Sequence, residues 1–152
     1  MKFRHHGHAG FDMARFRAVG NEPFFNKPRG GLWGSPLENG TDEWEQWCKS
    51  ENFGTGRLEP HFDFGFVVGT QAYTIDNLDA EKLFHRFEVP SSFGPLTSGI
   101  DFERMSLEYD AVILTSRGQR ATRLSDPVGL YGWDVASVLV MNPRVIVATQ
   151  EG

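Results

Sequence analysis

Cysteine is nearly absent from this sequence, since Cys48 is the only one among 152 residues. One thiol can form neither an internal disulfide nor a multi-cysteine zinc site, so we expect Cys48 to be a small buried residue in a chain that fits a reducing cytosol. Long hydrophobic runs are also missing, because no apolar stretch approaches the roughly 20 residues that span a bilayer. The N-terminus lacks the apolar centre of a signal peptide. We therefore expect a cytoplasmic protein with no membrane partner.

Several familiar functional motifs do not occur. The chain has no Walker or dinucleotide glycine fingerprint, no metalloprotease histidine pair and no Gly-x-Ser-x-Gly elbow. An excess of basic residues is missing too, because the formal net charge is -5, which gives no electrostatic footprint for nucleic acid. His5, His6 and His8 lie close together, but nothing nearby supplies a second fixed set of ligands, so we expect no metal site.

Aromatic residues, in contrast, are abundant, with 13 Phe and 4 Trp. Most of these rings must lie in a core, and a few are expected to line a pocket. The length corresponds to one domain, and we find no repeat or linker. Residues 1–12 mix histidine, glycine and charge without periodicity, which predicts a flexible leader, either native or left over from cloning. Residues 13–152 are expected to form a single α+β domain.

Hydrophobic periodicity predicts the main elements. Alternating residues over 13–19, 61–68 and 71–75 predict strands, and the two residues Gly69-Thr70 predict a hairpin between the last two. The nearly continuous apolar run 109–115 predicts a central strand buried on both faces. Further strands are expected over 32–35, 135–141 and 145–149, and helices after Thr41, after Asp76 and over 101–107. Residues 21–31 and 116–132 are expected to be loops, the second long enough to be functional or mobile.

Two stretches combine glycines with large aromatic rings and a few polar groups. One is Lys27 to Pro36, and the other is Leu130 to Asp134. Glycines let a backbone approach a ligand closely, while the rings and polar groups hold the ligand in place. We expect these stretches to be two walls of one cleft.

These stretches also carry a family resemblance. The phrases Lys-Pro-x-Gly-Gly-Leu-Trp-x-Ser-Pro, Trp-x-x-Trp-Cys, Tyr-Asp-Ala-Val, Leu-Tyr-Gly-Trp-Asp and Asn-Pro follow one another along the chain. Their order is similar to that in small phage and prophage proteins of the ADP-ribosyltransferase fold, over roughly residues 13 to 146. The resemblance implies an α+β fold in which split antiparallel β-sheets with short flanking helices hold NAD as the substrate.

The resemblance also implies roles for individual residues. Arg17 or Arg15, on the first strand, would fix the NAD phosphates or the ribose on the adenine side. Ser35 would hold the nicotinamide ribose and orient the catalytic acid. The ring packed on nicotinamide would be Trp33 or Tyr131. The glycine-rich entry to the same cleft contributes Lys27 and Gly31.

The acidic motif before a late strand falls on Asp134-Val135-Ala136. Departure of nicotinamide creates an oxocarbenium-like ribose, and a carboxylate hydrogen-bonded to the ribose 2-hydroxyl holds it more strongly as charge develops. The family pattern has a second acid, typically glutamate, two residues after Asp134, where this chain has Ala136. Either Asp134 carries the role alone, or the protein only binds NAD, or the alanine was introduced to trap a complex.

The sequence therefore favours an NAD-binding mono-ADP-ribosyltransferase-like protein of phage or bacterial origin that modifies a host macromolecule, protein or nucleic acid. An alternative is a non-enzymatic phage inhibitor that binds and blocks a host defence complex. Ala136, the net negative charge and the aromatic surplus favour this alternative, because an acidic protein can occupy a basic channel.

Overall fold

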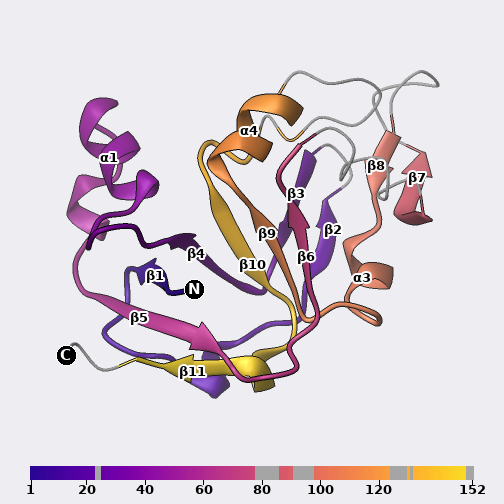
Figure 1. Cartoon of the computed structure of the whole chain (residues 1–152), viewed down its shortest axis with the longest axis horizontal. Helices are drawn as coiled ribbons and strands as arrows, with labels where there is room; N and C mark the ends of the chain where they lie inside the picture. Colours follow the sequence, from indigo (N-terminus) through magenta and orange to yellow (C-terminus); the bar gives the residue numbers. More distant parts are fainter. Residues whose placement is uncertain (23–24, 78–85, 91–97, 124–129, 131, 150–152) are drawn as a thin grey trace.

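The computed structural model describes residues 1–22, 25–77, 86–90, 98–123, 130 and 132–149. Its centre is a seven-stranded mixed sheet with the order β11-β5-β1-β4-β10-β9-β6 (Figure 1). The strands of this sheet are β1 (Phe3–His6), β4 (Leu32–Pro36), β5 (His61–Phe66), β6 (Ala72–Ile75), β9 (Ala111–Leu114), β10 (Ser137–Val140) and β11 (Ile146–Ala148). The chain is thus α+β, as the sequence predicts.

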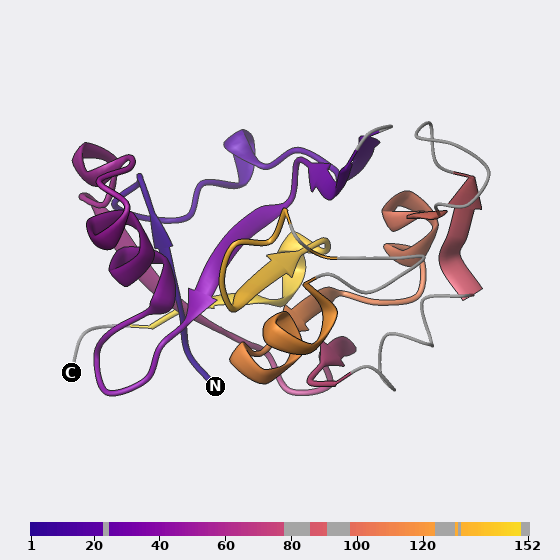
Figure 2. The same ribbon diagram turned by 90° about the horizontal axis from the view of Figure 1, so that it is seen from above.

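Smaller elements surround this sheet. Two-stranded ribbons are formed by β2 (Gly20–Glu22) with β3 (Phe25–Arg29), and by β7 (Glu88–Pro90) with β8 (Ser98–Ile100). The helices are α1 (Glu43–Ser50), α3 (Phe102–Met105) and α4 (Ser116–Thr122), with single 3-10 turns η1 (Met13–Arg15), η2 (Thr55–Arg57) and η4 (Pro143–Val145). Both ribbon views place α1 at one end of the molecule and the β7–β8 ribbon at the other (Figures 1 and 2). None of the helices in the described ranges is long and apolar enough to cross a membrane.

The strand β4 joins two halves of the sheet. Its residues 32–34 pair with β10, whereas its last residues, Ser35 and Pro36, pair with β1. The half beyond β10 ends in β9 and β6, which are the parallel pair, and the half beyond β1 continues through β5 to β11. The two neighbours of β4 thus pair with successive parts of it and share none of its residues.

Both faces of β9 are buried, which explains its continuous apolar sequence. Val112 and Leu114 belong to a core cluster that also contains Trp133, whereas Ala111 and Ile113 belong to a second cluster around Phe64. The prediction of a central strand in this region is therefore confirmed. The strand predictions for β4, β10 and β11 are also confirmed.

The flexible leader predicted for residues 1–12 is wrong for its first half. Residues 3–6 form β1, which lies between β5 and β4, and Phe3 is fully buried. Only one residue of this four-residue strand is apolar, so no periodic signal could appear. Its polar side chains are accommodated by partners, as the pair of Arg4 with Asp63 shows.

Three other local predictions are wrong because tertiary contacts override the pattern. Residues 13–19 contain the turn η1, capped by the Asp12 side chain, which accepts from the Ala14 N–H. The stretch 21–31, expected to be a loop, contributes to the β2–β3 ribbon. The strands β5 and β6 both exist, but β5 pairs with β1 and β11 while β6 pairs with β9, so they are not a hairpin.

The helix predictions are largely confirmed where they can be compared. The N-cap of α1 is Asp42 rather than Thr41, and α3 is capped by Asp101 with Phe102 and Met105 buried. The stretch 116–132, expected to be a loop, begins with α4. Most of the helix predicted after Asp76 falls on residues 78–85, outside the described residues.

Candidate functional site

A cavity of about 190 Å³ lies where β1, the end of β4 and the chain entering β10 meet beside α1. We call it the Trp33 cavity. It is lined by Arg4, His5, His6, Lys27, Trp33, Gly34, Ser35, Trp44, Asp134, Val135 and Ser137. Four residues that the sequence assigned to NAD are thereby brought together: Lys27, Trp33, Ser35 and Asp134.

The Trp33 indole, which lines this cavity, packs on the buried indole of Trp133. The Trp33 ring meets the buried Trp133 ring edge to face, with centroids 4.8 Å apart and an interplanar angle of 72°. The Trp133 Nε1–H donates to the carbonyl of Asn26 over 2.5 Å, and Lys27 Nζ lies 5.3 Å from the centre of the Trp33 ring. The two glycine-aromatic stretches of the sequence therefore pack against each other, and the Trp33 ring is held in one position.

Asp134 is the one carboxylate among the residues that line the Trp33 cavity. It is half-buried, and its side chain makes no hydrogen bond or ion pair with any residue in the described ranges. An ionised carboxylate can accept about four hydrogen bonds. Asp134 is therefore available to accept from hydroxyl groups of a ligand or to pair with a ligand cation.

The backbone after Asp134 is held from two sides. Ser35, whose exposed fraction is 2%, donates its hydroxyl hydrogen to the carbonyl of Ala136 over 2.8 Å. The Ala136 N–H donates to Glu43 Oε2 over 2.9 Å. Val138 pairs with Gly34, so the same register would set Ala136 opposite Pro36, which has no N–H. Ser35 and Glu43 thus supply the hydrogen bonds that the strand ladder cannot.

Position 136, where the family pattern has a second acid, does not face the Trp33 cavity. Val135 and Ser137 line the Trp33 cavity, whereas Ala136, with an exposed fraction of 3%, lines a different cavity of about 460 Å³ on the other side of the strand. We call this second space the Glu43 cavity. An acid two residues after Asp134 would therefore enter this second cavity, so the structure does not bring position 136 together with Ser35 and Asp134.

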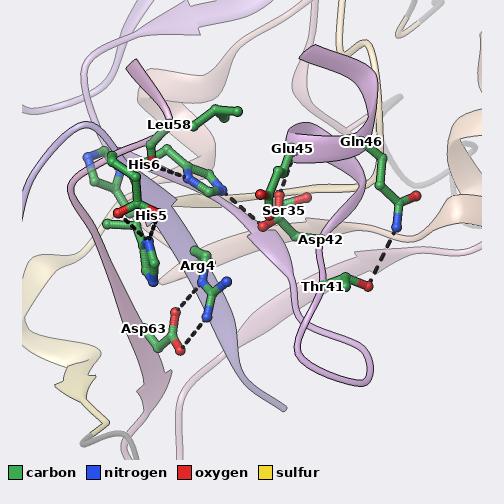
Figure 3. A network of polar contacts seen from close by, with 12 residues as sticks. Arg4, His5, His6, Ser35, Thr41, Asp42, Glu45, Gln46, Leu58 and Asp63 are labelled. Atoms are coloured by element: carbon green, nitrogen blue, oxygen red, sulfur yellow. Dashed lines mark hydrogen bonds and ion pairs between the residues drawn. The ribbon is translucent and has the colours of Figure 1, made fainter. Parts of the chain in front are cut away.

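His6 in β1 is doubly protonated in this arrangement. Its Nδ1 lies 2.8 Å from the Leu58 carbonyl and its Nε2 lies 2.9 Å from Asp42 Oδ2 (Figure 3). Both partners are acceptors, so both ring nitrogens must donate. Burial opposes the charge, but the hydrogen bonds to Asp42 and Leu58 and the negative charges of Asp42 and Glu45 together raise the pKa of His6.

His5 behaves in the opposite way. Its Nδ1 donates to the Trp33 carbonyl over 2.7 Å, which leaves Nε2 as the acceptor for His8 Nδ1 at 2.9 Å. Burial lowers the pKa of His5, so this ring is neutral near pH 7. Within the described residues no group of three or more His, Cys, Asp or Glu side chains is arranged to hold a metal ion.

The first strand of the structure is β1, which carries Arg4 and neither Arg15 nor Arg17. The Arg4 guanidinium is neutralised, because it binds both carboxylate oxygens of Asp63, at 2.7 and 3.1 Å, with exposed fractions of 13% and 12% (Figure 3). Arg4, His5 and His6 were not among the predicted site residues, because the pattern of residues 1–12 indicated a leader. The sequence of β1 carries no signal that could have found them, because Phe3 is its one apolar residue.

The remaining predicted site residues are dispersed. Arg15 and Gly31 line a third cavity, of about 110 Å³, which shares His5 with the Trp33 cavity and which we call the Arg15 cavity. Arg17 is exposed and donates to the carbonyls of Ala14 and Phe16 in its own turn. Tyr131 lies outside the described residues.

Comparison of the chain with protein-family models, with curated proteins and with solved structures finds no match.

Proposed function

We propose that the Trp33 cavity binds the nicotinamide and adjoining ribose of NAD, and that the chain is a mono-ADP-ribosyltransferase-like protein of phage or bacterial origin that modifies a host macromolecule. The observation that carries the proposal is the Asp134 carboxylate, which has no hydrogen-bond or ion-pair partner among the described residues and lines the same cavity as the Trp33 ring. The pairing along β4 also supports it, because two halves joined through successive parts of one strand resemble the split sheets of that fold.

The lining of the Trp33 cavity fits this half of NAD chemically. The nicotinamide ring of NAD is a flat cation, which an indole face attracts by about 2 kcal/mol when water is excluded. Asp134 complements that charge and can accept from the ribose hydroxyls, while the Lys27 ammonium, which lies over the Trp33 ring, suits a phosphate.

We assign the two halves of the dinucleotide to two cavities, because the Trp33 cavity alone is too small for the whole molecule. A volume of about 190 Å³ is below the ~300–1,000 Å³ typical of a site for a whole drug-sized ligand. We place the pyrophosphate beyond His5, toward the Arg15 cavity. Arg15 donates one N–H to the Gly10 carbonyl over 2.7 Å, and a guanidinium has five, so donors remain for phosphate oxygens.

The proposed reaction balances without a redox partner. The bond between the ribose C1′ and the nicotinamide nitrogen breaks, and its electron pair leaves with neutral nicotinamide. A nucleophilic atom of the acceptor forms the new bond to C1′ and releases its proton to solvent. Asp134, hydrogen-bonded to the 2-hydroxyl, would stabilise the positive charge that develops on the ribose.

The test is calorimetric titration of NAD together with an assay for released nicotinamide. We expect Asp134→Asn to keep the NAD dissociation constant within about threefold and to lower release at least about 100-fold, as for loss of one electrostatic stabiliser. Glu38→Gln, which neutralises an exposed carboxylate outside the Trp33 cavity, is the matched control and should change neither value. Absence of heat with millimolar NAD would reject the proposal.

A second pair of variants tests which face of the strand carries the chemistry. Ser137→Glu adds a carboxylate to the Trp33 cavity, whereas Ala136→Glu adds one to the Glu43 cavity. Only the first is expected to change nicotinamide release. If NAD binds to no variant, the alternative of a non-enzymatic inhibitor of a host complex is favoured, and recovery of a stoichiometric host partner would then support it.

A further inference from the structure

We propose that Glu43 is a positioning residue for Asp134 and acts through the Ala136 peptide from the opposite side of the strand. The role of Asp134 as a ligand group rests on the proposed function. The mechanical part, that Glu43 fixes the chain that carries Asp134, stands on contacts within the described residues.

The chain on the N-terminal side of Asp134 is anchored through Trp133. The Trp133 carbonyl accepts from the buried Gln119 Nε2 over 3.2 Å, and its indole N–H donates to Asn26. The ring itself is fully buried between Trp33 and Phe102. This side of Asp134 therefore cannot move without disturbing the core.

The chain on the C-terminal side is anchored through the Ala136 peptide. Glu43 is the first residue of α1, and its two carboxylate oxygens accept from different elements. Oε2 accepts from the Ala136 N–H at 2.9 Å, and Oε1 accepts from the hydroxyl of Ser116, the first residue of α4. One side chain thus ties α1 and α4 to the start of β10.

This contact decides whether Asp134 is held in place. Ser35 secures the Ala136 carbonyl, but no other side chain in the described residues accepts from the Ala136 N–H. Without Glu43 this N–H would be left unsatisfied in a part-buried site, and the segment would move to reach water. A carboxylate that stabilises developing charge must be held before the reaction, so its supporting backbone matters as much as its own charge.

Two variants at position 43 distinguish the loss of the hydrogen bonds made by Glu43 from the loss of its charge. Glutamine can still accept from the Ala136 N–H through its oxygen and can donate to the Ser116 hydroxyl through its amide, so Glu43→Gln should preserve the clamp. Glu43→Ala removes both contacts. Gln46→Ala changes an exposed residue of the same helix and is the matched control.

The first readout needs no ligand. Amide hydrogen exchange at Ala136, compared with core amides of Val112 and Leu139, should accelerate at least tenfold in Glu43→Ala, with the core amides changing less. The Asp134 χ1 angle, measured from three-bond couplings, should change from one rotamer to an average. Both values should stay at those of the unaltered protein in Glu43→Gln and Gln46→Ala. If Glu43→Ala does not fold, Ser116→Ala, which frees one oxygen of the clamp, takes its place with a smaller effect in the same direction.

The second readout is the rate of nicotinamide release, which should fall about tenfold in Glu43→Ala and return in Glu43→Gln, while the dissociation constant for NAD stays within about threefold, as for Asp134→Asn. Failure of the unaltered protein to bind NAD would reject the proposed function, while exchange and rotamer data would still decide the clamp. Three outcomes would each overturn the positioning role. In the first, Glu43→Ala accelerates hydrogen exchange equally at Ala136 and at the core amides, and in the second, Glu43→Gln does not restore the exchange rate of the unaltered protein. In the third, exchange at Ala136 accelerates while the Asp134 rotamer stays unchanged.

Discussion

Replacing His6 with glutamine should destabilise the protein by about 3 kcal/mol near pH 6, because the imidazolium is half of a buried ion pair. The exposed fractions of the His6 and Asp42 side chains are 7% and 0%. Removing one member of such a pair leaves the other charge buried and costs about 3–5 kcal/mol. We expect the lower end, because Asp42 keeps the hydrogen bond that it accepts from the Glu45 N–H as the cap of α1.

The pH dependence follows from the raised pKa of His6. A histidine whose pKa is higher in the folded than in the unfolded state contributes stability that is fully present below the unfolded pKa of about 6.5. That contribution is lost as pH rises through the folded pKa, so the unaltered protein should become less stable above pH 6.5. A tenfold difference in proton affinity between the folded and unfolded states corresponds to about 1.4 kcal/mol of stability.

His5 does not contribute to the decline in stability above pH 6.5, because burial lowers its pKa. A histidine whose pKa is lower in the folded than in the unfolded state reduces the free energy of unfolding as pH falls below about 6.5. His5 therefore affects stability below pH 6.5, and His6 affects it above pH 6.5.

The assay is urea unfolding between pH 5 and 9.5 for the unaltered protein and for His6→Gln. His61→Gln, at a histidine paired with the exposed Glu59, is the control and should keep the decline above pH 6.5. Nuclear magnetic resonance at pH 6 should show protons on both ring nitrogens of His6. The reasoning is refuted if His6→Gln retains the decline of the unaltered protein above pH 6.5, or if its stability at pH 6 is within about 0.5 kcal/mol of the unaltered value.

Three further predictions concern other contacts. The Arg4 hydrogen bond lowers the pKa of Asp63, so Asp63→Asn should lower the free energy of unfolding by about 3 kcal/mol at neutral pH. In urea unfolding experiments this difference from the unaltered protein should disappear as acid protonates Asp63. A Cβ at Gly118 would lie 2.0 Å from the Ile75 carbonyl oxygen, so Gly118→Ala should lower stability by about 3 kcal/mol, whereas Gly56→Ala, with open space, should change it little. Burial raises the pKa of the Cys48 thiol, so iodoacetamide should modify it about 100-fold more slowly in the native than in the urea-unfolded protein.

Strand existence could be predicted from this sequence, but strand partners could not. Alternation and continuous apolar runs are properties of one segment, and they located β4, β5, β9 and β10. Pairing depends on segments far apart in the chain, as β5 shows, because its neighbours β1 and β11 come from near the two ends of the described chain. A two-residue turn signal at Gly69-Thr70 therefore indicated a reversal of direction without fixing which strand would lie alongside.

The histidines that line the Trp33 cavity were hidden for a related reason. Lys27, Trp33, Ser35 and Asp134 lie in the two glycine-aromatic stretches, and the roles expected of Ser35 and Asp134 came from the family resemblance. His6 is different, since nothing local indicates that a histidine near the start of the chain meets a helix cap at residue 42. Its role depends on the pairing of β1 with β5, which brings η2 and α1 to it.

The placement of Ala136 shows that a spacing of two residues indicates a shared face only once the strand register is known. Asp134 and Val135 precede β10, which begins at Ser137, so Asp134 does not set the alternation of the strand. The pair of Val138 with Gly34 sets it, and that pair turns Ser137 toward the Trp33 cavity and Ala136 away from it. Position 136 therefore faces the Glu43 cavity, and under the proposed function the chemistry would depend on Asp134 and on how firmly its backbone is held.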